Sequence, residues 1–177
     1  MARRPAKAYR DPDKVAWTKY SKTKPRRSYI KSMPHRDLNQ FRMGIEKEDY
    51  DARINLISMQ DLIISDNSLE SSRQSANKHL EKTVSGNYHL MIKPYPHHVI
   101  RENKMIAGAG ADRLQKGMRK AFGRPSDRAA RIYRGQQIMT IKTYKANIPN
   151  IQIAMQRAMR KLSGAYSVQI ETEGENI

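Results

Sequence analysis

The segment from residue 101 to residue 125 combines the residue types best suited to contact with a polyanion. Four glycines and two acids accompany seven cations, which are Arg101, Lys104, Arg113, Lys116, Arg119, Lys120 and Arg124. Glycine permits positive φ and a close approach of the backbone to another molecule, and clustered cations attract a polyanion. We therefore predict a basic loop that enters nucleic acid and is flexible at Gly108, Gly110 and Gly117.

The positive charge is concentrated in two blocks of the chain. Residues 1–42 hold 13 basic and 3 acidic residues, and residues 101–145 hold 12 and 3, while the remainder is nearly neutral. A net charge of +17 and a pI near 10.2, clustered in this way, indicate nucleic-acid binding. Beyond the loop, the candidate RNA-binding cations are Arg3, Arg4, Arg10, Lys24, Arg26, Arg27, Arg128 and Arg131.

Motifs for catalysis, cofactors or metals are weak. The sequence GAGADR at 108–113 resembles the start of a dinucleotide-binding fingerprint, but Arg113 replaces its third glycine. His97 and His98 are adjacent, so on a strand they would face opposite sides, and we assign them strand-end packing or phosphate contact. The acids at 46–51 read as a solvated connection. We predict no catalytic residue, no bound metal and no cofactor, and therefore no enzyme.

Length and composition predict a single domain. A chain of 177 residues is long enough to bury a sizeable core. Cysteine is absent, which excludes disulfides and thiolate zinc sites. The longest apolar runs are far shorter than the roughly 20 residues that a membrane span needs. We expect a soluble, intracellular protein without a membrane partner.

The chain divides into an arm and a domain. Residues 1–40 contain four prolines and no clear periodicity, so we predict a basic extended N-terminal arm without continuous helix or sheet. Tyrosines and Trp17 lie among its cations; stacking on bases and anchoring to the core are both open for Trp17. Residues 41–177 form the predicted domain, from which the loop at 102–125 projects.

Periodicity predicts the elements of this domain. Strands are expected at 41–45, 54–65, 88–92, 98–101, 129–133, 137–144 and 166–171. One helix is expected to start with Asn67 as its cap and to stop at Gly86, and a second to start at Pro149 and stop at Gly164. The order β-β-α-β-β-loop-β-β-α-β gives an α+β fold class. We expect the arm and the loop on opposite sides of a compact core, an arrangement that favours folded RNA over a duplex.

Several runs of residues resemble one known family. PYPHHVIRENKMIAGAGADRLQKGMRKAFGRP and AARIYRGQQIMTIKT, with RRPAKAYR, FRMG at 41–44 and LESSRQSANKHL at 69–80, resemble the archaeal type of the L-ten-e family of large-subunit ribosomal proteins, the counterpart of the universal L-sixteen protein. The likeness covers most of the chain and is densest from Pro94 to Thr143.

The resemblance implies a single domain of the α/β-hammerhead type that binds large-subunit ribosomal RNA. It further implies a cytoplasmic large-subunit protein near aminoacyl-site transfer RNA, which it contacts transiently, and near the peptidyl transferase centre. Neighbouring ribosomal proteins are implied as further partners, and the loop matching Ile106 to Met118 would help to position the transfer RNA. An RNA-modifying enzyme and a free-standing nucleic-acid chaperone are the alternatives.

Overall fold

A computed structural model describes residues 4–15, 18, 20, 21, 23–104, 108–110 and 122–172 of the chain. Within these residues the strands pair into two sheets, one of five strands and one of three. Every strand pairing described is antiparallel. Together with two α-helices, these sheets confirm the predicted α+β class.

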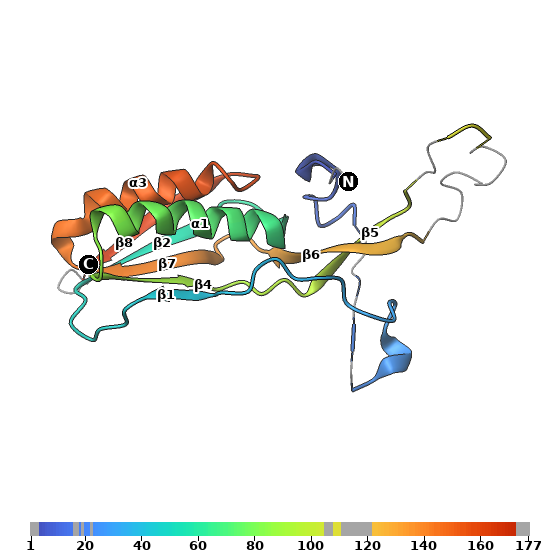
Figure 1. Ribbon diagram of the computed structural model, residues 1–177, viewed down its shortest axis with the longest axis horizontal. Helices are drawn as coiled ribbons and strands as arrows, with labels where there is room; N and C mark the ends of the chain where they lie inside the picture. Colours follow the sequence, from blue (N-terminus) through green and yellow to red (C-terminus); the bar gives the residue numbers. More distant parts are fainter. Residues whose placement is uncertain are drawn as a thin grey trace.

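The larger sheet carries both helices on one face, as Figure 1 shows. Its strands are ordered β1-β4-β7-β2-β8, with bounds β1 (Arg42–Gly44), β2 (Ala52–Ser58), β4 (Tyr88–Ile92), β7 (Gln137–Thr143) and β8 (Tyr166–Thr172). Helices α1 (Asp66–Thr83) and α3 (Ile148–Met159) pack against each other. The main apolar core is continuous through both helices and these strands, and includes Leu56, Leu69, Leu90 and Met155.

The smaller sheet extends away from the helices (Figure 1). It consists of β3 (Leu62–Ser65), β5 (His98–Glu102) and β6 (Arg124–Ile132) in the order β3-β6-β5. Strands β5 and β6 are antiparallel neighbours, and residues 108–110, which follow β5, lie beyond both at the far end of the molecule (Figure 1). The smaller sheet therefore forms the base from which the basic loop departs.

The two helices follow their periodicity. Along α1, Leu69, Ser72, Ala76 and Leu80 are all buried, as the helical spacing predicts. Along α3, Ile151, Met155 and Ala158 are buried, and Leu162 remains in the core after the helix has ended at Met159. Neither helix has the length and apolar character that crossing a membrane requires, as far as the described residues go.

The prediction of one longer or bent strand at 54–65 is wrong, because the structure has two strands there, β2 and β3, which lie in different sheets. The chain turns at Met59 and Gln60, which are exposed, and the Ser58 hydroxyl donates to the Gln60 carbonyl at 2.7 Å. All residues of β3 are buried, so no alternation marks the division. The element order is consequently β-β-β-α-β-β-β-β-α-β.

The predicted cap of the first helix is also wrong. Ser65 caps α1, and its hydroxyl accepts a hydrogen bond from the Ser68 amide. Asn67 instead lies inside the helix, where its backbone amide donates to the Asp66 carboxylate at 2.8 Å. Because β3 ends at Ser65, the helix starts directly from the strand, and a serine suits this position as well as an asparagine does.

Strands β6 and β7 follow each other in sequence but do not pair. β6 pairs with β3 and β5, whereas β7 pairs with β2 and β4. β6 also begins at Arg124, five residues before the predicted start at Ala129, and includes Pro125. The connection through Gly135, whose φ is 80°, therefore carries the chain from one sheet to the other.

Candidate nucleic-acid interface

The arm packs along the smaller sheet. The Arg10 carbonyl accepts a hydrogen bond from the Ile63 amide of β3 at 2.7 Å. Tyr9 and Val15 pack against a second, smaller apolar cluster that comprises Ile63, Ile100 and Ala129. Apolar burial and a backbone hydrogen bond thus attach the start of the arm to this sheet.

Two arginines of β6 hold the arm at further points. The Arg131 guanidinium donates to the Pro12 carbonyl at 2.9 Å, and the Arg128 guanidinium donates to the Pro34 carbonyl at 2.7 Å. Hydrogen bonds from charged donors contribute about 1.5–3 kcal/mol each. Both arginines were predicted to bind RNA, and the structure gives each of them a contact with the arm. Whether their remaining N–H groups also contact RNA stays a prediction.

The stem of the loop is held by a stacked pair. The Arg101 guanidinium lies over the Phe122 ring, 3.8 Å from its centroid, and donates to the Phe122 carbonyl at 3.2 Å. At Gly123, whose φ is 77°, an added Cβ would lie 3.1 Å from the Glu102 backbone, so the two sides of the stem approach closely there. These contacts join the residues on either side of the loop.

Glu102 joins the arm to the loop stem. Its buried carboxylate lies 3.8 Å from the Arg4 guanidinium and 3.7 Å from the Lys104 ammonium. The expectation that the arm and the loop lie on opposite sides of the core is therefore wrong. They meet at the smaller sheet because apolar residues and backbone carbonyls of the arm find partners on β3, β5 and β6.

The structure brings most of the described candidate cations to this end of the molecule. The exposed ones are Arg4, Arg10, Lys24, Arg26, Lys104 and Arg124, and the half-buried ones are Arg101, Arg128 and Arg131. Gly108 and Gly110 are exposed, and an added Cβ would meet no atom within 4 Å at either. Predictions for Arg3, Arg113, Lys116, Gly117, Arg119 and Lys120 and for the side chain of Arg27 fall outside the described residues.

The two adjacent histidines differ sharply in environment. His97 is exposed, whereas His98 is fully buried at the start of β5 and accepts a long hydrogen bond, 3.4 Å, from the Thr18 amide through Nδ1. Burial, with lesser effects from Arg131 and Arg101, lowers the pKa of His98 to about 4. A neutral imidazole here packs at the strand end, one of its two predicted roles.

Two of the acids between β1 and β2 contact other parts of the domain. Glu46 lies 3.6 Å from the Lys142 ammonium and 3.9 Å from His89 Nδ1, and the Asp51 carboxylate accepts a hydrogen bond from the Lys145 amide at 2.8 Å. No group of three or more His, Asp or Glu side chains suited to a metal ion occurs in the described part of the chain.

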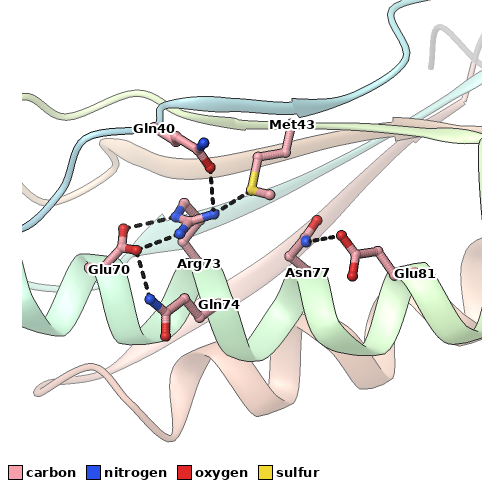
Figure 2. Close-up of polar contacts among 7 residues, drawn as sticks. All are labelled: Gln40, Met43, Glu70, Arg73, Gln74, Asn77 and Glu81. Carbon is pink, nitrogen blue, oxygen red and sulfur yellow. Dashed lines mark hydrogen bonds and ion pairs between the residues drawn. The ribbon is translucent and has the colours of Figure 1, made fainter.

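Two of the family-like motifs meet around Arg73, which Figure 2 shows. This buried guanidinium pairs with the Glu70 carboxylate, with Nε to Oε2 at 2.8 Å, and also contacts Gln40 and the sulfur of Met43. The Arg73 pairing lowers the pKa of Glu70. Since Arg73 lies in the run at 69–80 and Met43 in FRMG, this cluster joins α1 to β1. These motif residues thus support the fold.

A partly exposed group of three rings and one arginine was not predicted from the sequence. Arg36, Phe41, Tyr95 and His97 come together where the end of the arm passes the connection between β4 and β5. Two features of the sequence mark these residues: Tyr95 lies between two prolines, and His97 and Arg36 are adjacent to His98 and His35. Neither feature predicts that residues so far apart in the chain are in contact.

Comparisons with known proteins identify the family of the chain. The family model described as "Ribosomal protein L16p/L10e" matches residues 15–169. A protein of Staphylothermus marinus named large ribosomal subunit protein uL16 is 47% identical over 138 residues, which cover 77% of this chain and 79% of that protein. Proteins of the same name from Natronomonas pharaonis and Haloarcula marismortui are 39% and 37% identical, and each alignment covers 100% of this chain and 98% of the relative. The chain therefore belongs to the L16p/L10e family of ribosomal proteins.

Proposed function

We propose that the arm and the loop stem form one binding face for large-subunit ribosomal RNA. Through its family, the protein is a structural constituent of the large ribosomal subunit, which is cytoplasmic, and it associates there with ribosomal RNA and other ribosomal proteins. The family is structural and not enzymatic, so the alternatives of an RNA-modifying enzyme and a free-standing chaperone are set aside.

One observation carries the proposal. Exposed cations from the arm and from both sides of the loop stem, Arg4, Arg10, Lys104 and Arg124, lie on or beside the smaller sheet. Lys24 and Arg26 are also exposed, in the arm segment between the attachments at Thr18 and Pro34. The segment from 43 to 100, which supplies α1 and much of the larger sheet, holds 6 basic and 8 acidic residues. Cations that neutralise phosphates release counterions from RNA. The asymmetry of charge thus indicates which end of the protein meets the RNA.

Salt dependence tests this binding face. If about 6–10 phosphates are neutralised, log affinity should fall with log salt at a slope of about −5 to −9. Replacing Lys24 and Arg26 with glutamine should make the slope shallower by about 1–2, because each cation contacts about one phosphate. The matched control replaces Lys82 and Lys161, exposed cations on and beside the helices, and should leave the slope unchanged. Equal effects of the two pairs would contradict the proposal.

We propose further that the loop approaches aminoacyl-site transfer RNA near the peptidyl transferase centre and helps to position it. The segment 108–110 lies at the far end of the molecule (Figure 1), and a Cβ added at Gly108 or Gly110 would meet no atom within 4 Å. Both observations support a projecting role. Deleting residues 108–117 should leave the core folded and bound to ribosomal RNA, since loops affect stability weakly, while it slows translation. Global unfolding of the deletion variant would assign this segment to the core instead.

A further inference from the structure

Four side chains form a stack, here called the ring cluster: Arg36 and Phe41, which are half-buried, and Tyr95 and His97, which are exposed. The Phe41 and Tyr95 rings are stacked, with centroids 5.6 Å apart and planes 14° apart, and the His97 ring is tilted on Tyr95 with centroids 4.6 Å apart. The Arg36 guanidinium carbon lies 5.7 Å from the Tyr95 centroid and 6.0 Å from that of Phe41. Arg36 also donates to the Tyr95 hydroxyl at 3.1 Å.

Hydrogen bonds fix the backbone of both chain segments that form the ring cluster. Beside Arg36, the Pro34 carbonyl accepts from Arg128 at 2.7 Å, and the Asp37 amide donates to the Asp66 carboxylate at 3.0 Å. The Phe41 carbonyl accepts from the Ile92 amide at 2.8 Å. The cluster is therefore attached to both sheets and to the start of α1.

Tyr95 is fixed in a similar way by its neighbours. Pro94 and Pro96 flank it and are both buried, and proline holds φ near −65°. The Tyr95 carbonyl accepts from the His97 amide at 3.0 Å, which closes a tight turn. Yet Tyr95 retains 38% of its exposure and His97 is exposed. A rigid backbone thus presents rings whose outer surfaces face solvent.

This combination matches the chemistry of base recognition. Unpaired RNA bases stack on aromatic rings and on arginine planes, and arginine adds a cation–π contribution. Lys93 is exposed two residues before Tyr95, so a phosphate attached to the base would meet the positive charges of Lys93 and Arg36. The acid beside Arg36, Asp37, lies 3.8 Å from His35 Nε2. An acidic peptide would use the cations but would leave the ring surfaces without a planar partner.

We propose that the ring cluster is a stacking platform for an unpaired base of ribosomal or transfer RNA. The proposal deepens the proposed function and rests on it, because it names one base-contacting site beside a face that otherwise contacts phosphates. Tyr95 and His97 supply the stacking surface, and Arg36 is a positioning residue whose hydrogen bond orients the Tyr95 ring. Phe41 supports Tyr95 from the inner side of the stack.

Binding of two short strands by the full-length chain tests the platform. The probes are a single-stranded oligoadenylate and an abasic strand of the same length, which carries the same phosphates without bases. Tyr95→Ala should weaken oligoadenylate binding about 5- to 150-fold, the range for loss of one stacked base, and should leave abasic binding unchanged. Tyr95→Phe, which keeps the ring, should retain most of the oligoadenylate affinity.

Tyr133→Ala is the matched control, because Tyr133 is a more exposed tyrosine, at 63%, outside the ring cluster. It should change neither affinity. Equal loss of both affinities in Tyr95→Ala, or an unchanged oligoadenylate affinity, would overturn the platform without overturning the proposed RNA-binding face. If the unaltered chain bound neither strand, the proposed RNA-binding face itself would fail.

Ultraviolet cross-linking in intact large subunits identifies the occupant. Subunits stripped of transfer RNA should yield a nucleotide adduct on Tyr95 or His97 if the base belongs to ribosomal RNA. An adduct that appears only after transfer RNA is added assigns the base to transfer RNA and also supports the platform. A cross-link from Tyr95 to a ribosomal protein, with no nucleotide adduct under either condition, would overturn it.

Discussion

Replacing Arg131 with methionine tests whether the arm is fastened to the smaller sheet by the contacts described above. The Arg131 guanidinium donates to the Pro12 carbonyl at 2.9 Å, and two residues earlier the Arg10 carbonyl accepts from the Ile63 amide at 2.7 Å. Methionine has a similar length and can pack its stem in place, but it has no donor for Pro12. The variant therefore removes one attachment of the arm while changing the sheet little.

The size of the effect follows from the kind of hydrogen bond. A charged donor contributes about 1.5–3 kcal/mol, and every 1.4 kcal/mol is about tenfold in an equilibrium constant. Opening of the arm near Pro12 should therefore become about 10- to 150-fold more frequent. Hydrogen exchange at the Ile63 amide should accelerate by about this factor, because Arg10, its partner, moves away with Pro12.

The neighbouring amide of Ile64 serves as the internal control. In an antiparallel strand, successive residues direct their amides to opposite edges, so Ile64 faces β6, where its register partner is Ala130. Its exchange should change little in Arg131→Met. Exchange at Ile63 that is as slow in the variant as in the unaltered chain would show that Arg131 does not hold the arm.

Three further predictions concern the stability of the fold. In the folded chain the pKa of His98 is about 4, against an ordinary value of 6.5. The neutral imidazole therefore makes its full contribution to stability above about pH 6.5, and about 3 kcal/mol is lost as the pH falls towards 4. In His98→Asn, the free energy of unfolding measured against pH should lack this loss. Arg73→Leu should cost about 3 kcal/mol by leaving Glu70 without its ion pair, measured by denaturant unfolding, and the salt slope of RNA binding should not change. Gly44→Ala should cost about 2–4 kcal/mol by the same measurement, because φ is 84° and the added Cβ would lie 2.2 Å from the Tyr88 carbonyl oxygen; a loss within the error of the measurement would mean that the backbone relaxes there.

Periodicity made the helices and several strands predictable. The burial of Leu69, Ala76 and Leu80 on α1 follows directly from a spacing of three and four residues. Strands β4 and β7 end within one residue of the predicted positions. In each case the signal is local, because one face of the element must be apolar for the element to pack.

The division of the chain between two sheets was not predictable in this way. The run from 54 to 65 is apolar on both sides of the turn, and no local sequence pattern predicts that β2 and β3 join different sheets. The choice of cap was similarly undetermined, since Ser65 and Asn67 are both suitable. It was decided by where β3 ends, which depends on its pairing with β6.

The position of the arm could not be predicted for a further reason. Arg128 and Arg131 donate to backbone carbonyls, and every residue of the arm offers such an acceptor, so the sequence carries no pairing signal. The same holds for the ring cluster, in which Arg36 and Tyr95 are 59 residues apart. Basic residues therefore indicated the class of partner correctly while giving no information on how the basic segments meet.

The most direct test of the shared RNA-binding face is the chemical modification of lysines in intact large subunits. Lys24 in the arm, Lys104 at the loop stem, and Lys82 and Lys161 on and beside the helices are all exposed in the chain alone. Lys24 and Lys104 should be strongly protected in the subunit and should become reactive after nuclease digestion of the RNA, to a greater degree than Lys82 and Lys161. Full reactivity of Lys24 and Lys104 in the intact subunit, or protection that survives removal of the RNA, would contradict the account.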